Sequence, residues 1–281
     1  MSIIPCRQLL TSSLTLYVNW WGSDTNDGLA PQSAFQTIAA ARLAFSTKYD
    51  TGGYDHFIEL AEGIYNGTTL TEVTGGGSIT IRGQGSSTIL KGNIQINQRR
   101  TRYILKNLTF SPENTFAISA LNGYIELAEG LVYNITQATS PALLVAELDG
   151  VINVTNDFAL TYTTGVLPTL AFARSSGLIV LHNIQVTATG ALNWLTATLW
   201  SQSSGIIDAR NFRHTGSDPT SGLRTIQESN GYIIGDSGTD ILGTINGVAP
   251  LVTQTEPVVI PQAQLGFNLP ISFSTATYTL S

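Results

Sequence analysis

The sequence predicts an all-β solenoid, in which short strands wind upward in coils of nearly constant length. Three observations predict this fold: a glycine recurs at the centre of similar segments, isoleucines recur at a fixed place after it, and charged residues are few. Charged residues make up 11% of the 281 residues, against roughly 25% in an average soluble domain. Ser, Thr, Asn, Gln and Gly must supply the polar surface instead. This composition suits a β-rich, extracellular or particle-borne protein and argues against a cytosolic enzyme.

The repeat is carried by a small polar residue followed by glycine in five segments. These glycines are Gly123, Gly150, Gly177, Gly205 and Gly231, and they lie 27, 27, 28 and 26 residues apart. Glycine adopts positive φ at little cost, so the Asn-Gly, Asp-Gly and Ser-Gly pairs predict a tight turn at each position.

Side chains fall into columns when the segments are aligned on this glycine. Two places after it stand Ile125, Ile152, Ile179, Ile207 and Ile233. Four places after it stand Leu127, Val154, Leu181, Ala209 and Gly235. Five places before it stand Ile118, Val145, Phe172, Trp200 and Ile226. Alternate side chains of a strand point the same way, so the first two columns share one face, while the third belongs to a strand before the turn. Such a unit completes its core only against its neighbours, which predicts a solenoid with about three strands per coil over residues 51–247.

Residues 1–50 are expected to cover the open end of this solenoid, since that end would expose apolar core. Ser33 and Gln36 have the spacing of a capping box, which predicts a short amphipathic helix. The apolar face of that helix would carry Phe35, Ile38, Ala39 and Leu43.

The same segment begins like a calcium loop, with Asp24, Asn26 and Gly28 at suitable spacing. Leu29 stands where such a loop requires glycine, and Phe35 stands where it requires the closing glutamate. With only three scattered histidines in the chain (His56, His182 and His214), we expect no metal site.

The stretches "LYVNWWGSDTNDGLAPQSAFQTIAAA", "FIELAEGIYNG" and "ITIRGQGSSTIL", within residues 16–90, resemble the start of right-handed parallel β-helix proteins of the pectate-lyase-like superfamily. The resemblance implies a right-handed parallel β-helix with a short N-terminal capping helix. That superfamily includes polysaccharide lyases, hydrolases, esterases and phage tailspikes and fibres, so the fold alone does not give the activity. The low charge and the Ser/Thr/Asn-rich coils look most like a phage-type spike or fibre.

Residues 248–281 differ in style from the repeat, with prolines followed by the alternating "ISFSTATYTLS". Proline disfavours regular coils. We expect an irregular C-terminal β extension that either caps the rod or exchanges strands between subunits.

Outward-facing charges recur one coil apart, a spacing of about 4.8 Å. The candidate carbohydrate-binding residues are Glu147, Arg174, His182, Arg210 and Glu228.

Asp208 and Asp236 are the candidate catalytic pair, because an inverting glycosidase needs carboxyl groups roughly 6.5–9.5 Å apart. The alternative, which we favour, is that all these charges form a solvated ladder of weak ion pairs. The Asn-Thr-Asp, Gly-His-Gly and Arg-x-Lys motifs of polygalacturonase-like enzymes are missing, as are the pectate lyase Asp-His pair and acid cluster. Enzymatic activity, as a polysaccharide depolymerase, stays open.

An apolar column directly after the repeat glycine is expected to point outward. It consists of Tyr124, Val151, Leu178, Ile206 and Tyr232. An exposed apolar stripe normally marks a contact surface. Three such rods around an axis would cover it, which predicts a homotrimer; a loop folding back over the stripe is the alternative.

Taken with these features, the resemblance implies a phage-type virion appendage at the particle surface, partnered by itself, by cell-surface polysaccharide and by other virion proteins. The alternatives are a polysaccharide-degrading lyase or hydrolase and a purely structural virion component. The net charge of −6 offers no basic stripe for nucleic acid, and no apolar run approaches the ~20 residues of a membrane helix. We expect no cofactor, and the single cysteine, Cys6, allows no intrachain disulfide. Trp20, Trp21, Trp194 and Tyr162 are either core residues or platforms for sugar rings.

Overall fold

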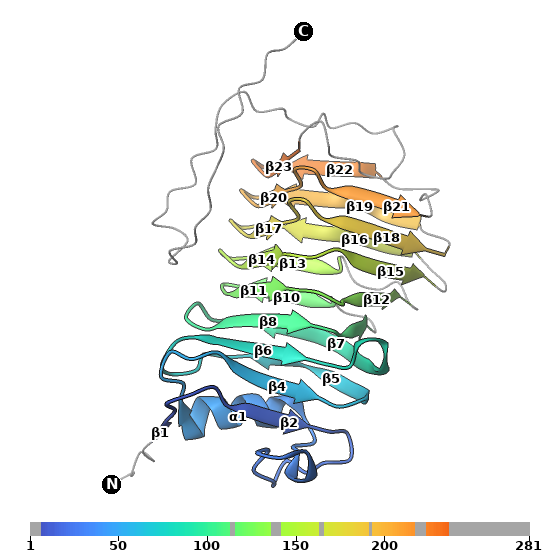
Figure 1. The fold of residues 1–281 in the computed structure, drawn as a ribbon. Coiled ribbons are helices and arrows are strands. Elements are labelled where there is room, and N and C mark those ends of the chain that lie inside the picture. The colour runs from blue at the N-terminus through green and yellow to red at the C-terminus, as the bar shows by residue number, and fades with distance from the viewer. Residues whose placement is uncertain are drawn as a thin grey trace.

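The chain is a parallel β-helix, as the sequence predicts. A computed structural model describes residues 7–112, 116–135, 142–162, 166–190, 193–216 and 223–235. Figure 1 shows the strands stacked in successive layers, from a helix at the N-terminal, blue end to the orange strands at the other end. All strand pairs within the described ranges run parallel, because each strand pairs with the equivalent strand of the next coil.

One side of the rod is a nine-stranded sheet, which we call sheet B. Its strands in spatial order are β2 (Thr15–Val18), β4 (His56–Leu60), β6 (Ser78–Arg82), β8 (Arg102–Lys106), β11 (Tyr124–Leu127), β14 (Val151–Val154), β17 (Leu178–Val180), β20 (Ile206–Asp208) and β23 (Tyr232–Ile234).

The other two sides belong to a twelve-stranded sheet, sheet C. Its lower strands, β5 (Gly63–Leu70) and β7 (Thr88–Ile96), are long and serve both sides. Higher coils use two strands instead: β7 pairs with β9 through its first half and with β10 through its second half. The first side continues through β9 (Thr109–Ser111), β12 (Val132–Ile135), β15 (Phe158–Tyr162), β18 (Gln185–Thr189) and β21 (Arg213–Gly216). The second side continues through β10 (Ile118–Leu121), β13 (Leu144–Glu147), β16 (Val166–Ala173), β19 (Asn193–Gln202) and β22 (Leu223–Glu228).

The predicted isoleucine column is confirmed as the buried ladder of sheet B. Its members pair in register from coil to coil and are at most 2% exposed. The ladder continues downward through Tyr103, Ile79 and His56, all fully buried. His56 satisfies both ring nitrogens: Nδ1 accepts from the Leu14 amide at 2.9 Å, and Nε2 donates to the Thr51 carbonyl at 3.0 Å.

The column five places before the glycine lies on a strand before the turn, as predicted, and its members from Val145 upward pair in register from coil to coil. Ile118 pairs with Leu144 instead of Val145, because the turn after β10 is one residue shorter than the turn after β13. Val145 and Phe172 form a separate apolar cluster, against which Trp200 packs, whereas Leu144 belongs to the main core. From Val145 upward the column therefore lies outside the main core, and only its lowest member, Ile118, belongs to that core.

The repeat glycines are required for a different reason from the one predicted. In the turn between β16 and β17, the left-handed residues are Ser175 and Ser176, with φ of 51° and 66°, and Gly177 is not among the positive-φ residues. A Cβ on Gly177 would instead collide with the carbonyl of Ala146 in the coil below. Gly150 would meet the Ala120 carbonyl in the same way. Close stacking of the backbone between coils therefore requires glycine here.

The N-terminal end is covered by helix α1 (Ile38–Lys48), as Figure 1 shows. Its N-cap is Thr37, whose side chain accepts from the Ala40 amide at 3.1 Å, so the predicted capping box at Ser33 is wrong. Ser33 ends a short 3₁₀ helix, η1 (Pro31–Ser33), and its hydroxyl donates to Asp27 at 2.6 Å. The buried face of α1 consists of Ile38, Ala41, Ala44 and Phe45, while Leu43 is 51% exposed.

The calcium-like residues are used structurally. Asp24 accepts hydrogen bonds from the amides of Gln36 and Thr37, both at 2.9 Å, and from the Thr37 hydroxyl at 2.8 Å. Asn26 donates to the Ala34 carbonyl at 2.9 Å. The turn thus fastens the helix start to the end of sheet B.

The other small elements lie at the ends of this cap and between coils. They are β1 (Gln8–Leu9), β3 (Tyr49–Asp50) and η2 (Gly85–Ser87). Strand β2 lies within residues 1–50, so that segment contributes a strand of sheet B as well as the helix. The expected extension at residues 248–281 lies outside the described residues.

Candidate functional site

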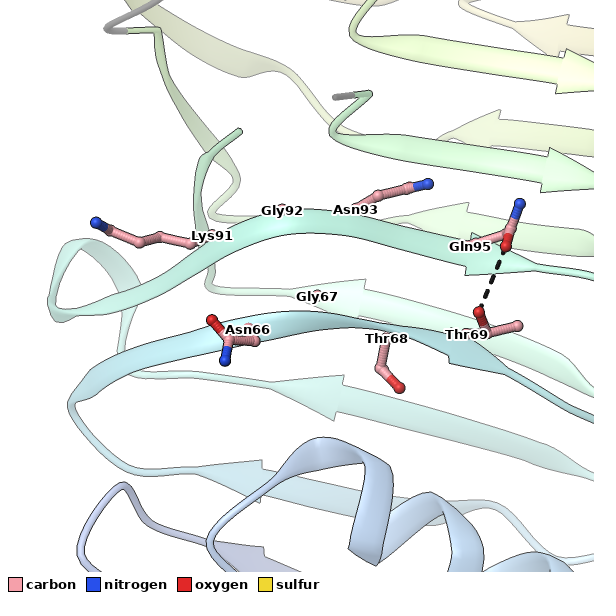
Figure 2. A pocket seen from close by; sticks show the side chains of 8 residues that line it. All are labelled: Asn66, Gly67, Thr68, Thr69, Lys91, Gly92, Asn93 and Gln95. Atoms are coloured by element: carbon pink, nitrogen blue, oxygen red, sulfur yellow. Dashed lines mark hydrogen bonds between the residues drawn. The ribbon is translucent and has the colours of Figure 1, made fainter. Parts of the chain in front are cut away.

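A polar groove of about 420 Å³ lies where β5 and β7 bend between the two sides of sheet C. We call it the corner groove. Its lining consists of Asn66, Gly67, Thr68, Thr69, Lys91, Gly92, Asn93 and Gln95. Figure 2 shows these residues along two neighbouring strands.

The groove exists because the two strands are out of step at the bend. Asn66 pairs with Lys91, but Thr68 pairs with Ile94, so one residue of β5 opposes two of β7. This arrangement is a β-bulge, which bends the strand that carries the extra residue.

Two glycines make the bulge possible. Gly92 has φ of +85°, which other residues rarely adopt. A Cβ on Gly67 would collide with the backbone of Asn93. Without side chains at these two positions, the floor of the groove is bare backbone.

The walls of the groove offer amide and hydroxyl groups. The Thr69 hydroxyl donates to Gln95 Oε1 at 3.4 Å, the interaction drawn in Figure 2. Asn93 Nδ2 donates to Ser119 Oγ of the next coil at 3.3 Å, which orients its amide. Asn66 is exposed, and Lys91 adds an ammonium group. Because amides both donate and accept, this lining suits a ligand rich in hydroxyl groups.

The corner groove lacks the groups for glycoside hydrolysis. Its eight lining residues, all of them described, include no Asp or Glu. Two carboxyl groups flanking the scissile bond are the usual requirement of that reaction.

The structure divides the predicted carbohydrate-binding residues between two places. Glu147 and Arg174 form an ion pair at 2.7 Å, in neighbouring coils of sheet C. Glu228, further up this side, accepts from Trp200 Nε1 at 3.3 Å. His182 and Arg210 instead follow the C-terminal ends of the sheet B strands β17 and β20. The five residues therefore do not form one site.

The carboxylate of Asp208, a predicted catalytic residue, forms an ion pair with the guanidinium of Arg210. The guanidinium holds both carboxylate oxygens, with Nε at 2.9 Å from Oδ1 and a terminal nitrogen at 2.6 Å from Oδ2. Asp208 is only 8% exposed. Its predicted partner, Asp236, lies outside the described residues, so the catalytic pair stays a prediction.

The predicted interface stripe is a continuous column on the outer face of sheet B. Each residue pairs in register with the next through five successive coils: Tyr124, Val151, Leu178, Ile206 and Tyr232. Tyr124 is only 4% exposed, and burial raises the pKa of its hydroxyl. Val151, Ile206 and Tyr232 are half-buried. The use of this stripe as an oligomer interface stays a prediction.

The aromatic residues considered as sugar platforms fall into different classes. Tyr162 belongs to the core, at 4% exposed, whereas Trp20 and Trp21 are 58% and 57% exposed. The side chain of Trp194, like Cys6, lies outside the described part of the chain.

Sequence reasoning missed the corner groove. The signal was present, since glycine inside a strand indicates a bulge or a close backbone approach. Both "YNGTT" and "LKGNIQ" contain one, but the glycine repeat on which the columns were aligned begins only at Gly123.

Within the described ranges, no three His, Cys, Asp or Glu side chains gather as a metal site would require. A helix long and apolar enough to span a membrane is likewise absent from the part of the chain that the structure describes. Comparisons with protein-family models, with curated proteins and with solved structures find no match to the chain.

Proposed function

We propose that the chain is a rigid, glycan-binding rod that acts as a virion appendage, of the phage spike or fibre kind, and contacts surface glycans of a host cell. The observation that carries this proposal is the corner groove, with its bare floor and its walls of Asn, Gln and Thr side chains. The groove sits on stacked parallel strands, so its geometry is fixed before a ligand arrives. A preformed site loses little conformational entropy on binding.

Two further features support an appendage. Residues 16–90 resemble pectate-lyase-like β-helices, and that superfamily includes phage tailspikes and fibres. The groove is open and shallow, which favours weak binding by a single copy. Several copies held together bind a surface far more tightly than one copy does, and a homotrimer would present three grooves to one cell. Other virion proteins would hold the rod at the particle surface.

The proposal is tested by applying the purified protein to an array of bacterial capsular and O-antigen polysaccharides. Any polysaccharide that binds is then titrated calorimetrically against the wild type and Gln95→Ala. Loss of one or two amide hydrogen bonds, at about 0.5–1.5 kcal/mol each, should weaken binding roughly 2- to 150-fold.

Gln185→Ala is the matched control, because Gln185 is an exposed amide on β18 of the same sheet. It should bind as the wild type does. An array without any bound polysaccharide, or equal affinities for Gln95→Ala and the control, would contradict the proposal.

A further inference from the structure

A second groove, of about 430 Å³, crosses the outer face of sheet B near its N-terminal end. We call it the cap groove. Tyr17, Glu59 and Arg82 lie side by side on β2, β4 and β6 and line it. Glu59 and Arg82 form an ion pair, and the Arg82 guanidinium lies 4.6 Å from the centre of the Phe57 ring. Arg82 keeps 38% of its side chain exposed, so its guanidinium can still reach a ligand.

The N-terminal loop supplies another part of the lining. The amide of Tyr17 donates to the Gly28 carbonyl at 2.8 Å, and the amide of Phe35 donates to the Tyr17 carbonyl at 2.9 Å. These bonds hold Pro31 and Ala34 at the groove as apolar lining. Backbone hydrogen bonds to β2 therefore fix this side of the cap groove in place.

The cap groove ends at one corner of sheet B, where two side-chain amides and a tryptophan lie. Asn19 and Gln84 line the groove there. Trp20 follows Asn19, and its indole lies against Gly63, where an added Cβ would be 2.6 Å from Cδ1. Trp20 nevertheless stays 58% exposed. An exposed aromatic side chain that is held in place is a ready contact surface for a ligand that is apolar on one side and polar at its edges.

Strand β5 leads directly from this tryptophan to the corner groove. After Gly63 come Ile64, which is 56% exposed, the buried Tyr65, and Asn66, which lines the corner groove. Alternate residues of a strand face the same way, so Ile64 and Asn66 share the outer face. Three residues at about 3.3 Å each place Gly63 roughly 10 Å from Asn66. A path of contact surface thus joins the two grooves.

We propose that the cap groove and the corner groove bind one extended segment of a linear polysaccharide, which passes over Trp20 and Ile64 between them. This inference rests on the proposed glycan-binding function and deepens it, since it names a polymer segment as the ligand instead of a terminal sugar. Recognition then belongs to the lowest coils of the rod. The charge ladder higher up, at Glu147 and Arg174, takes no part.

The test uses the array-positive polysaccharide, cut by partial acid hydrolysis and separated by size from disaccharide to decasaccharide. Wild type, Trp20→Ala and Gln95→Ala are titrated with each fragment. For the wild type we expect affinity to rise at least tenfold between the shortest and the longest fragments. Trp20→Ala should weaken the longest fragments at least fivefold and leave the short fragments that occupy the corner groove unchanged.

Ile64→Ser is a second variant, and since its side chain is exposed the fold should tolerate it. It should weaken the long fragments alone, as Trp20→Ala does. Tyr54→Ala is the matched control, because Tyr54 is 44% exposed and precedes β4, at the end of that strand opposite the cap groove. It should bind every fragment as the wild type does.

The outcomes separate the two proposals. If long fragments bind no better than short ones, or if neither Trp20→Ala nor Ile64→Ser affects them, the shared path is overturned while Gln95→Ala still reports on the corner groove. If Trp20→Ala weakens binding and Gln95→Ala does not, the corner groove is overturned as the glycan site, and the joint path is overturned with it.

Discussion

Replacing Gly177 by alanine separates two reasons for the repeat glycine. A Cβ at this position would collide with the carbonyl carbon and oxygen of Ala146 and lie 2.8 Å from the amide nitrogen of Glu147. These are backbone atoms of the coil below, so they cannot turn away as a side chain could. The coils must move apart instead.

The expected cost follows from the bonds at this junction. The amide of Arg174 donates to the Ala146 carbonyl, and the amide of Leu178 donates to the Gly150 carbonyl, both at 2.9 Å. Disrupting both costs about 1–3 kcal/mol, and overpacking adds about 1–3 kcal/mol. Alanine recovers about 0.4–1 kcal/mol by restricting the unfolded chain. We expect Gly177→Ala to lower the free energy of unfolding by roughly 3 kcal/mol.

The neighbouring Ser176 is the matched comparison. Its φ of 66° is left-handed, which costs a non-glycine residue roughly 1–2 kcal/mol. Glycine relieves this strain but loses roughly 0.5–1 kcal/mol of unfolded-state entropy. Ser176→Gly should therefore be neutral or stabilise the fold by up to about 1.5 kcal/mol. Urea unfolding followed by far-ultraviolet circular dichroism measures both variants. A wild-type midpoint for Gly177→Ala, or a clear loss for Ser176→Gly, would refute the stacking argument.

The core ladder, the buried tyrosines and two outward-facing side chains give further tests. Ile152→Ala should lower the free energy of unfolding by about 3 kcal/mol and Ile152→Val by about 1 kcal/mol, because Ile152 is fully buried. If both variants unfold at the urea concentration of the wild type, Ile152 is not part of a buried core ladder. Burial raises the pKa of Tyr103 and Tyr133 above its ordinary value. Above a pH of about 10 the unfolded chain therefore releases protons that the folded chain retains. The free energy of unfolding then falls by about 1.4 kcal/mol per tyrosine for each further pH unit. An absorbance titration in which these hydroxyls ionise near pH 10 with the fold intact would contradict it. Asp208→Asn should destabilise the fold by about 1–3 kcal/mol, because it weakens the bonds that Arg210 makes to that carboxylate. If the wild type releases reducing ends from capsular polysaccharide and Asp208→Asn does not, the protein is a depolymerase. Light scattering should give the mass of a trimer for the wild type and of a monomer for Ile206→Asp, and a monomeric wild type would remove the stripe as an interface.

The columns of sheet B could be predicted because their strands directly follow the glycine. No residue can be gained or lost between the glycine and the strand, so residues at equal distance from it, such as Ile125 and Ile152, pair in register. The column before the glycine loses its register at its lowest member, Ile118, for the converse reason. Turn length there differs between coils, which shifts Ile118 by one place relative to Val145.

The reason for the glycine itself could not be read from the sequence. A glycine after Ser or Asn has the pattern of a turn that needs positive φ. The same pattern results when two left-handed residues, such as Ser175 and Ser176, make the turn and the following residue touches the backbone below. Only the three-dimensional stacking of the coils distinguishes a glycine needed for positive φ from a glycine needed for close backbone contact.

The corner groove could not be predicted because it lies where the repeat is irregular. Partners along the core ladder of sheet B are 27, 27, 28 and 26 residues apart above Ile125, but 23, 24 and 22 residues apart between His56 and Ile125. An alignment at one period cannot pair Gly67 with Gly92, although each glycine is visible in the sequence. Regular coils place equivalent residues above one another and so produce uniform ladders, which stabilise a rod but offer similar surface at every level. A local binding site needs a departure from that regularity. The bulge opposite Gly67, where the spacing between β5 and β7 changes from 25 to 26 residues, provides one. This is the physical reason for seeking recognition in the lower coils and stability in the upper ones.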